Sequence, residues 1–144
     1  MPSAAVKFLF LQALLLSSGC GGSSTEAVEE RKSSQEAFNE AETAFGSNDY
    51  TTAAAKYAEA IEAAGLYPEL YDIARAKLIV CLAAQKKFSE AEQELDTLKS
   101  QHLDKAVVLA AESYLLSAQG KKSAAKKAFA QARKIRRGIK PFGK

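Results

Sequence analysis

The sequence predicts an all-α protein of helix–turn–helix repeats, with about three antiparallel helix pairs. Its 144 residues suit one domain, and a composition of 47% hydrophobic and 26% charged residues is that of a globular chain. Alanine-rich stretches with few β-branched residues favour helices. A short pattern also recurs three times along the chain. Two cysteines exclude a disulfide-rich scaffold and a four-cysteine zinc site.

The first 19 residues have the layout of an export signal. Lys7 gives a positive start, the apolar run Phe8–Leu16 follows, and small residues precede Cys20. That run is too short to span a bilayer. Small residues directly before a cysteine resemble the lipobox of bacterial lipoproteins, which implies cleavage before Cys20 and acylation of its thiol. The alternatives are a plain signal peptide that leaves Cys20 free, a retained anchor and a cytosolic start.

Residues 20–32 are then expected to be the lipidated cysteine and a flexible tether, because Gly-Gly-Ser-Ser-Thr follows the cysteine. Beyond it, apolar side chains recur at the spacing of one helical face. Gly65 is expected to end one helix and Pro68 to begin the next. The helices expected in this way lie at about 26–47, 51–64, 68–85, 88–100, 104–119 and 122–136.

The second helix of each pair carries the recurring pattern: an alanine, a bulky apolar residue four positions later and an apolar residue seven positions later. The alanines are separated by 38 and 34 residues. Thr51, Ser89 and Ser123 precede them and are good N-cap residues. The nine pattern positions are Ala53, Tyr57, Ala60, Ala91, Leu95, Leu98, Ala125, Phe129 and Ala132.

A period of 34 residues with an aromatic–Ala–bulky–Ala signature resembles the tetratricopeptide repeat, here over residues 33–136. The resemblance implies a protein-binding adaptor or scaffold with a groove lined by the first helices. Its register assigns to that groove Phe38, Asn39, Glu42, Lys77, Val80 and Tyr114, with Ala76, Ala110 and Ala111. Only Asn39 and Lys77 suit the capture of a carboxylate, so an apolar segment or helix is the expected partner. The alternative is that these residues pack between repeats.

Charge is distributed unevenly. Residues 20–70 carry a net charge of −7 and residues 71–144 one of +9, and no acidic residue follows Lys121. A basic tail is expected at 137–144. The cations either cap the exposed end of the repeats or contact an anionic surface, such as lipid head groups or an acidic protein. The expected basic surface consists of Lys122, Lys126, Lys127, Arg133 and Arg137.

No motif points to an enzyme, a metal or a cofactor. Cys81 lies in an apolar stretch and is expected to be a buried, inert thiol, and His102 has no partner at ligand spacing. Glu90, Glu92 and Glu94 read as solvated charge. The sequence therefore predicts an exported envelope lipoprotein facing the bacterial periplasm, with a protein or peptide partner and no nucleic acid. Which membrane holds it and its oligomeric state are left open.

Overall fold

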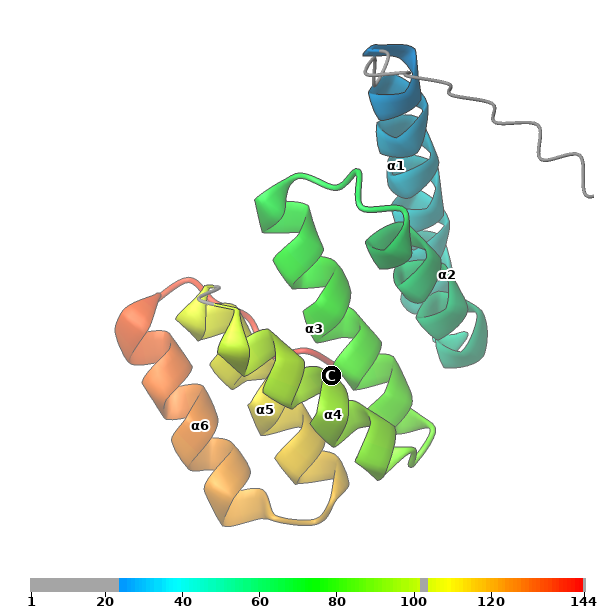
Figure 1. Cartoon of the computed structure of the whole chain (residues 1–144). Helices are drawn as coiled ribbons and strands as arrows, with labels where there is room; N and C mark the ends of the chain where they lie inside the picture. Colours follow the sequence, from blue (N-terminus) through cyan, green and yellow to red (C-terminus); the bar gives the residue numbers. More distant parts are fainter. Residues whose placement is uncertain (1–23, 102–103, 144) are drawn as a thin grey trace, which may run out of the picture.

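The computed structural model describes residues 24–101 and 104–143. Cys20 and His102 lie outside this range. In the described residues the chain forms six helices and no strand, so the predicted all-α fold is confirmed (Figure 1). The helices are α1 (Ser24–Gly46), α2 (Tyr50–Glu62), α3 (Pro68–Ala84), α4 (Phe88–Ser100), α5 (Lys105–Ala118) and α6 (Lys122–Ile135).

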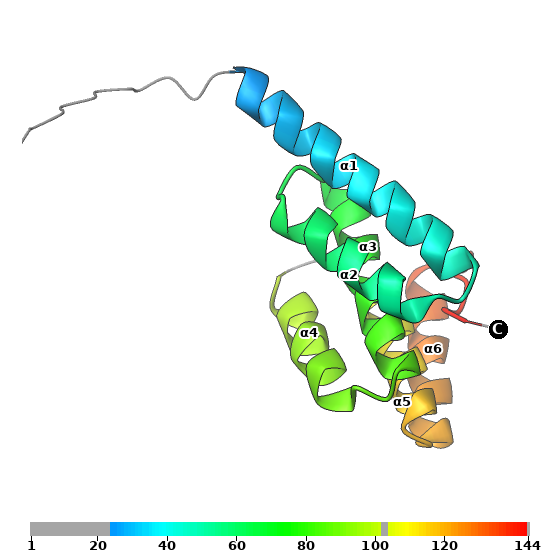
Figure 2. The same ribbon diagram turned by 90° about the vertical axis from the view of Figure 1, so that its right-hand side faces the viewer.

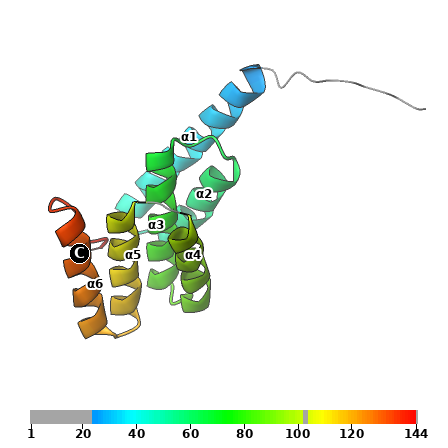
Figure 3. The same cartoon turned by 60° about the vertical axis from the view of Figure 1, so that its left-hand side comes forward.

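Consecutive helices form three pairs, and the second pair joins the other two. α1 packs on α2, α3 on α4, and α5 on α6. α3 also contacts α2 and α5, so it has neighbours on three sides, and α5 lies between α3 and α6 (Figure 3). The first helix of each pair thus lines one face of the stack, which we call the inner face.

The turns inside the three pairs have one geometry. Two residues after the first helix of each pair ends, the chain has a residue with positive φ: Asn48 at 61°, Lys86 at 61° and Gly120 at 80°. The next N–H then reaches back to the last helical turn, as in a Schellman motif. These three bonds run from Asp49 N to Ala44 O, from Lys87 N to Leu82 O and from Lys121 N to Leu116 O, at 2.9, 2.9 and 2.8 Å. The turns are separated by 38 and 34 residues, as the sequence pattern is, which shows that the repeats are structural.

Gly65 has a different role from the expected one. The left-handed residue after α2 is Ala64, with φ of 54°, while Gly65 is where the chain passes close to α1. A Cβ at Gly65 would lie 2.5 Å from Arg31 Cα. The Gly65 N–H also donates to the buried Ser34 hydroxyl at 2.9 Å. Glycine is therefore required by contact with α1, and Pro68 begins α3 as expected.

The expected tether at 20–32 is wrong for its described part, because residues 24–32 belong to α1. Figure 2 shows that α1 extends beyond α2 at its N-terminal end. The contacts of this half of the helix include the Ser34–Gly65 bond and the Arg31 guanidinium, which lies 5.3 Å from the centroid of the Tyr67 ring. Three glutamates and one alanine among residues 24–32 are good helix formers, and the helix expected from residue 26 begins two residues earlier.

The core follows the repeat pattern. All nine pattern positions are buried except Phe129, which is half-buried. Ala53 and Ala91 are fully buried where helices cross, because a small side chain allows a close approach. Tyr57, the largest fully buried side chain, meets the rings of Phe38 and Phe45 edge to face. In the described residues, no helix has the length and apolar character needed to cross a membrane.

Candidate partner-binding surface

Two of the residues expected in the groove are not on the surface. The exposed fraction is 7% for Phe38 and 0% for Val80. Phe38 packs on Tyr57, and Val80 lies on α3, which has helices on three sides. The repeat register identified the correct helices. It could not show how much of each helix is buried by the neighbouring helices. Both residues are buried in the fold, as are the alanines assigned with them, Ala76, Ala110 and Ala111.

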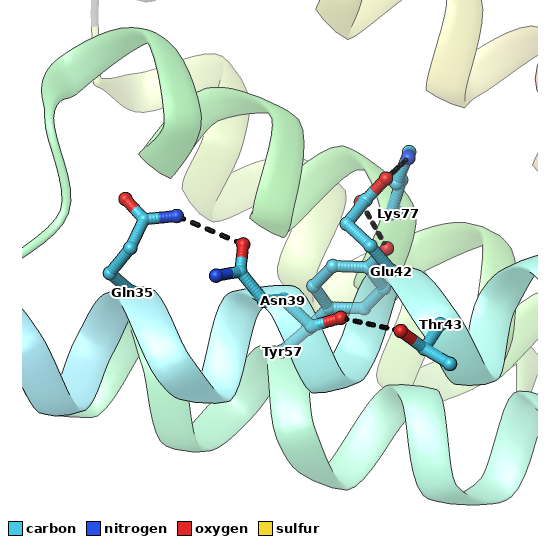
Figure 4. Close-up of polar contacts among 6 residues, drawn as sticks. All are labelled: Gln35, Asn39, Glu42, Thr43, Tyr57 and Lys77. Atoms are coloured by element: carbon cyan, nitrogen blue, oxygen red, sulfur yellow. Dashed lines mark hydrogen bonds and ion pairs between the residues drawn. The ribbon is translucent and has the colours of Figure 1, made fainter.

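Glu42 and Lys77 point toward one another from α1 and α3 (Figure 4). Lys77 Nζ donates to both carboxylate oxygens of Glu42 at 2.6 Å, and the Tyr57 hydroxyl donates to Oε1 at 2.6 Å. Burial, and then the Glu42 carboxylate, raise the pKa of Tyr57. Lys77 Nζ also lies 5.0 Å from the centroid of the Phe45 ring. Lys77 is thus neutralised within the fold and is not free to hold a partner's carboxylate.

Asn39 is the predicted groove residue most open to solvent. Its Oδ1 accepts a hydrogen bond from Gln35 Nε2 at 3.1 Å, and its backbone oxygen accepts one from Thr43 Oγ1 at 3.0 Å (Figure 4). Both contacts lie along the surface of α1 and are exposed. Asn39 alone offers one polar group, which cannot define a pocket.

Tyr114 holds the corresponding place on α5 and is half-buried. Burial is the main cause that raises the pKa of Tyr114, and the nearby Tyr50 contributes. Among the described residues no hydrogen bond reaches the Tyr114 hydroxyl. Its ring lies against the end of the chain, since a Cβ at Gly143 would be 2.5 Å from Tyr114 Cε2. Tyr114 is therefore an aromatic side chain whose hydroxyl is left without a hydrogen bond in the described part of the chain.

We call residues 137–143 the C-terminal tail. The tail returns from the end of α6 across α5 toward α3 (Figure 1). Ile139 and Phe142 pack against the core, while Arg137 and Lys140 are exposed. At its start, Arg136 forms an ion pair with Asp104 and its carbonyl accepts from Ile139 N at 3.1 Å. The expected basic tail is thus more than an electrostatic extension. The apolar residues on either side of Lys-Pro were the signal in the sequence, and sequence reasoning missed it.

The basic surface of α6 carries cations without partners in the described residues. None of its five predicted members forms an ion pair there, whereas Lys56, Arg75, Lys77, Lys99 and Arg136 all do. Three of the five, Lys122, Lys126 and Arg133, surround a hollow of about 550 Å³ between α5 and α6. Phe129, Ala125 and Pro141 supply apolar walls. We call this hollow the basic hollow; Lys127 and Arg137 do not line it.

The remaining titratable groups have structural places. Cys81 is fully buried, and burial raises the pKa of its thiol to about 12.

Two of the three glutamates expected to be solvated on α4 contact another helix. Glu94 pairs with Arg75, and Glu92 accepts a hydrogen bond from Gln119. Asp72 is buried: one carboxylate oxygen accepts from Asp104 N at 3.2 Å and the other has no partner in the structure as described. No group of three or more histidine, cysteine or acidic residues in the described part is placed to hold a metal ion.

Three stacked pairs of antiparallel helices define a helical-repeat module, a class that generally works in protein interaction as an adaptor or scaffold. The family model described as Tetratricopeptide repeat-like domain matches residues 25–138, and the chain belongs to this family. The match covers the six helices, apart from the first residue of α1, and the first two tail residues. Domains of this class are generally non-catalytic. No curated protein and no solved structure is significantly similar to the chain.

Proposed function

We propose that the protein is an envelope lipoprotein that works as an adaptor. In this proposal, acylated Cys20 holds it to a membrane, facing the periplasm, and the repeat domain binds a protein or peptide partner at the inner face around Tyr114. The lipobox-like residues before Cys20 support the anchor, and family membership supports the interaction role.

The observation that carries the binding site is the difference between Tyr114 and its counterparts on the inner face. Glu42 and Lys77 satisfy each other, but the Tyr114 hydroxyl has no partner among the described residues. A half-buried tyrosine offers apolar area and one hydrogen bond at low entropic cost, and such residues often dominate binding energy. With Lys77 neutralised, an apolar segment suits this surface better than a terminal carboxylate.

Photo-crosslinking in the producing cell tests the site. Benzoylphenylalanine would be placed at Tyr114 and, as the matched control, at Gln93, which is exposed on α4 away from the inner face. We expect a discrete adduct from Tyr114 and none from Gln93. Equal adducts from both positions, or none from Tyr114, would contradict the proposed site.

The anchor has its own test. The chain from Cys20 to Ser24 can reach at most about 14 Å, so α1 would begin close to the membrane. We expect the wild-type protein to fractionate with membranes and Cys20→Ser to accumulate as uncleaved precursor. A soluble mature protein with no lipid mass on its first residue would defeat the lipoprotein proposal.

The basic hollow supports a second candidate function, binding to an anionic surface. Its cations are unpaired in the described residues and surround an apolar floor. Replacing Lys122, Lys126 and Arg133 by Gln should weaken cosedimentation with anionic vesicles by at most about 1 kcal/mol per charge. Lys86→Gln with Lys87→Gln is the control, because both lysines are exposed on another turn. Equal losses in the two variants, or binding that salt does not weaken, would exclude a specific role for the hollow.

A further inference from the structure

The C-terminal tail has the character of a bound peptide. It is neither helix nor strand, and in the described residues its one backbone–backbone hydrogen bond, from Ile139 N to Arg136 O, stays close to the end of α6. Beyond that bond the tail meets the fold through side chains, chiefly Ile139 and Phe142. A segment attached in this way can leave without breaking any secondary structure.

The end of the tail fits closely on Tyr114. Gly143 has φ of 79°, and an added Cβ would lie 2.5 and 3.2 Å from two atoms of the Tyr114 ring. Positive φ and the absence of a side chain let the backbone itself approach the aromatic ring. Tyr114 is the residue through which the proposed function binds a partner, so the tail lies where that partner would.

We propose that the C-terminal tail is a displaceable, built-in ligand of the inner face. The partner is a short non-helical protein segment that carries an aliphatic and an aromatic residue spaced like Ile139 and Phe142, and it binds by taking the place of the tail. This inference rests on the proposed function. The tail holds the site closed in the free protein, and the apparent affinity for a partner falls by the fraction of molecules that are open.

The chain contains no tryptophan, so Phe142→Trp places a unique fluorophore in the tail while the inner face stays native. A synthetic peptide of residues 136–144 is then added to the full mature chain. We expect the emission to move to longer wavelength and acrylamide quenching to rise to the level of a free tail. Half-displacement should need a peptide concentration of the order of millimolar, the effective concentration of a short tether. A peptide with Ser in place of Ile139 and Phe142 is the control and should have no effect.

Two glycine variants, made in the Phe142→Trp chain, keep the test independent of the peptide. Gly143→Ala forces a Cβ into the Tyr114 ring, whereas a Cβ at Gly138 would meet nothing within 4 Å. We expect Gly143→Ala to increase quenching of the indole and Gly138→Ala to leave it unchanged. Both variants should keep the helical content of the parent, because the tail lies outside the six helices.

Two results would overturn the inference. An indole already as quenchable as the free peptide would mean that the tail does not cover the site. An indole that millimolar peptide leaves fully protected would mean that the tail is a permanent part of the fold. Failure of the proposed function looks different: the peptide would displace the tail, yet photo-crosslinking at Tyr114 would yield no adduct even in the Gly143→Ala chain.

Discussion

The first and last helix pairs share one repeat pattern but use it differently. Between α1 and α2, the rings of Phe38, Phe45 and Tyr57 pack together, and Tyr57 donates to Glu42. On α6, three alanines fill the buried positions and Phe129 stays half-exposed. The charged groups differ in the same way: Lys56 is held by Glu40 and Glu59, while the cations of the basic hollow have no partner in the described residues.

This difference indicates that the first and last helix pairs have different roles in the stack. Side chains of the first pair satisfy one another and stabilise the fold. Within the described residues α6 packs chiefly on α5, so apolar and basic groups on its other sides stay exposed. At Tyr114 the chain's own tail provides the cover that a further helix would give. Position in the stack, more than the repeat motif, decides which of these side chains stay exposed.

Truncating one aromatic side chain in the first pair and one in the last should give the largest difference in stability loss. Tyr57→Ala removes a fully buried ring and should lower the free energy of unfolding by about 3–5 kcal/mol. Phe129→Ala removes a half-buried ring with fewer neighbours and should cost about 1–2 kcal/mol. Urea denaturation of both variants measures the difference. Equal losses would show that the two ends contribute alike.

Gly65→Ala should test how much the N-terminal half of α1, which extends beyond α2, contributes to stability. The new Cβ would meet backbone atoms of Glu30 and Arg31, which cannot move like a side chain, so we expect a loss of about 1–3 kcal/mol. Gly46→Ala is the matched control: at the end of α1 a Cβ would meet nothing within 4 Å, and alanine favours the helix. If thermal melting ranks the two variants equally, the close contact at Gly65 is wrong.

A larger side chain should destabilise the fold where helices cross, and it should be tolerated on the exposed face of α6. Ala53→Leu and Ala91→Leu each enlarge a fully buried residue and should cost about 1–3 kcal/mol. Ala130→Leu enlarges an exposed residue of α6 and should change the melting temperature little. An unchanged midpoint for Ala91→Leu would contradict the crossing assigned to the second pair.

The smallest expected effect concerns Asp72, which joins the second pair to the third through Asp104 N. Burial raises the pKa of Asp72 above its usual 3.8, so the folded state binds this proton more tightly than the unfolded state. The free energy of unfolding of the wild type, relative to Asp72→Asn, should therefore rise as the pH falls from neutral through that raised pKa. Paired denaturation curves between pH 7 and pH 4 measure it, and a difference independent of pH would contradict the burial.

Local pattern was enough to predict much of the fold. The helix-forming residues and the alanine spacing predicted the all-α repeat architecture and the core positions, which are buried except for the half-exposed Phe129. Burial on the inner face was not predictable, because it depends on how α2, α4 and α5 pack on α3, where Val80 is fully buried. The contact of Gly143 with Tyr114 joins residues far apart in the chain, and no spacing rule reports it. The candidate site was therefore only partly accessible from sequence.

Hydrogen exchange of the mature chain tests the division between the two ends most directly, since it measures the free energy of local opening along the chain. We expect α2 and α3, around Tyr57 and Ile79, to exchange only through global unfolding. The amides of Ile139–Gly143 should open at far lower free energy, and Gly143→Ala should accelerate their exchange without changing α2. Protection of the tail equal to that of α2 would contradict both the division and the tail as a displaceable cover.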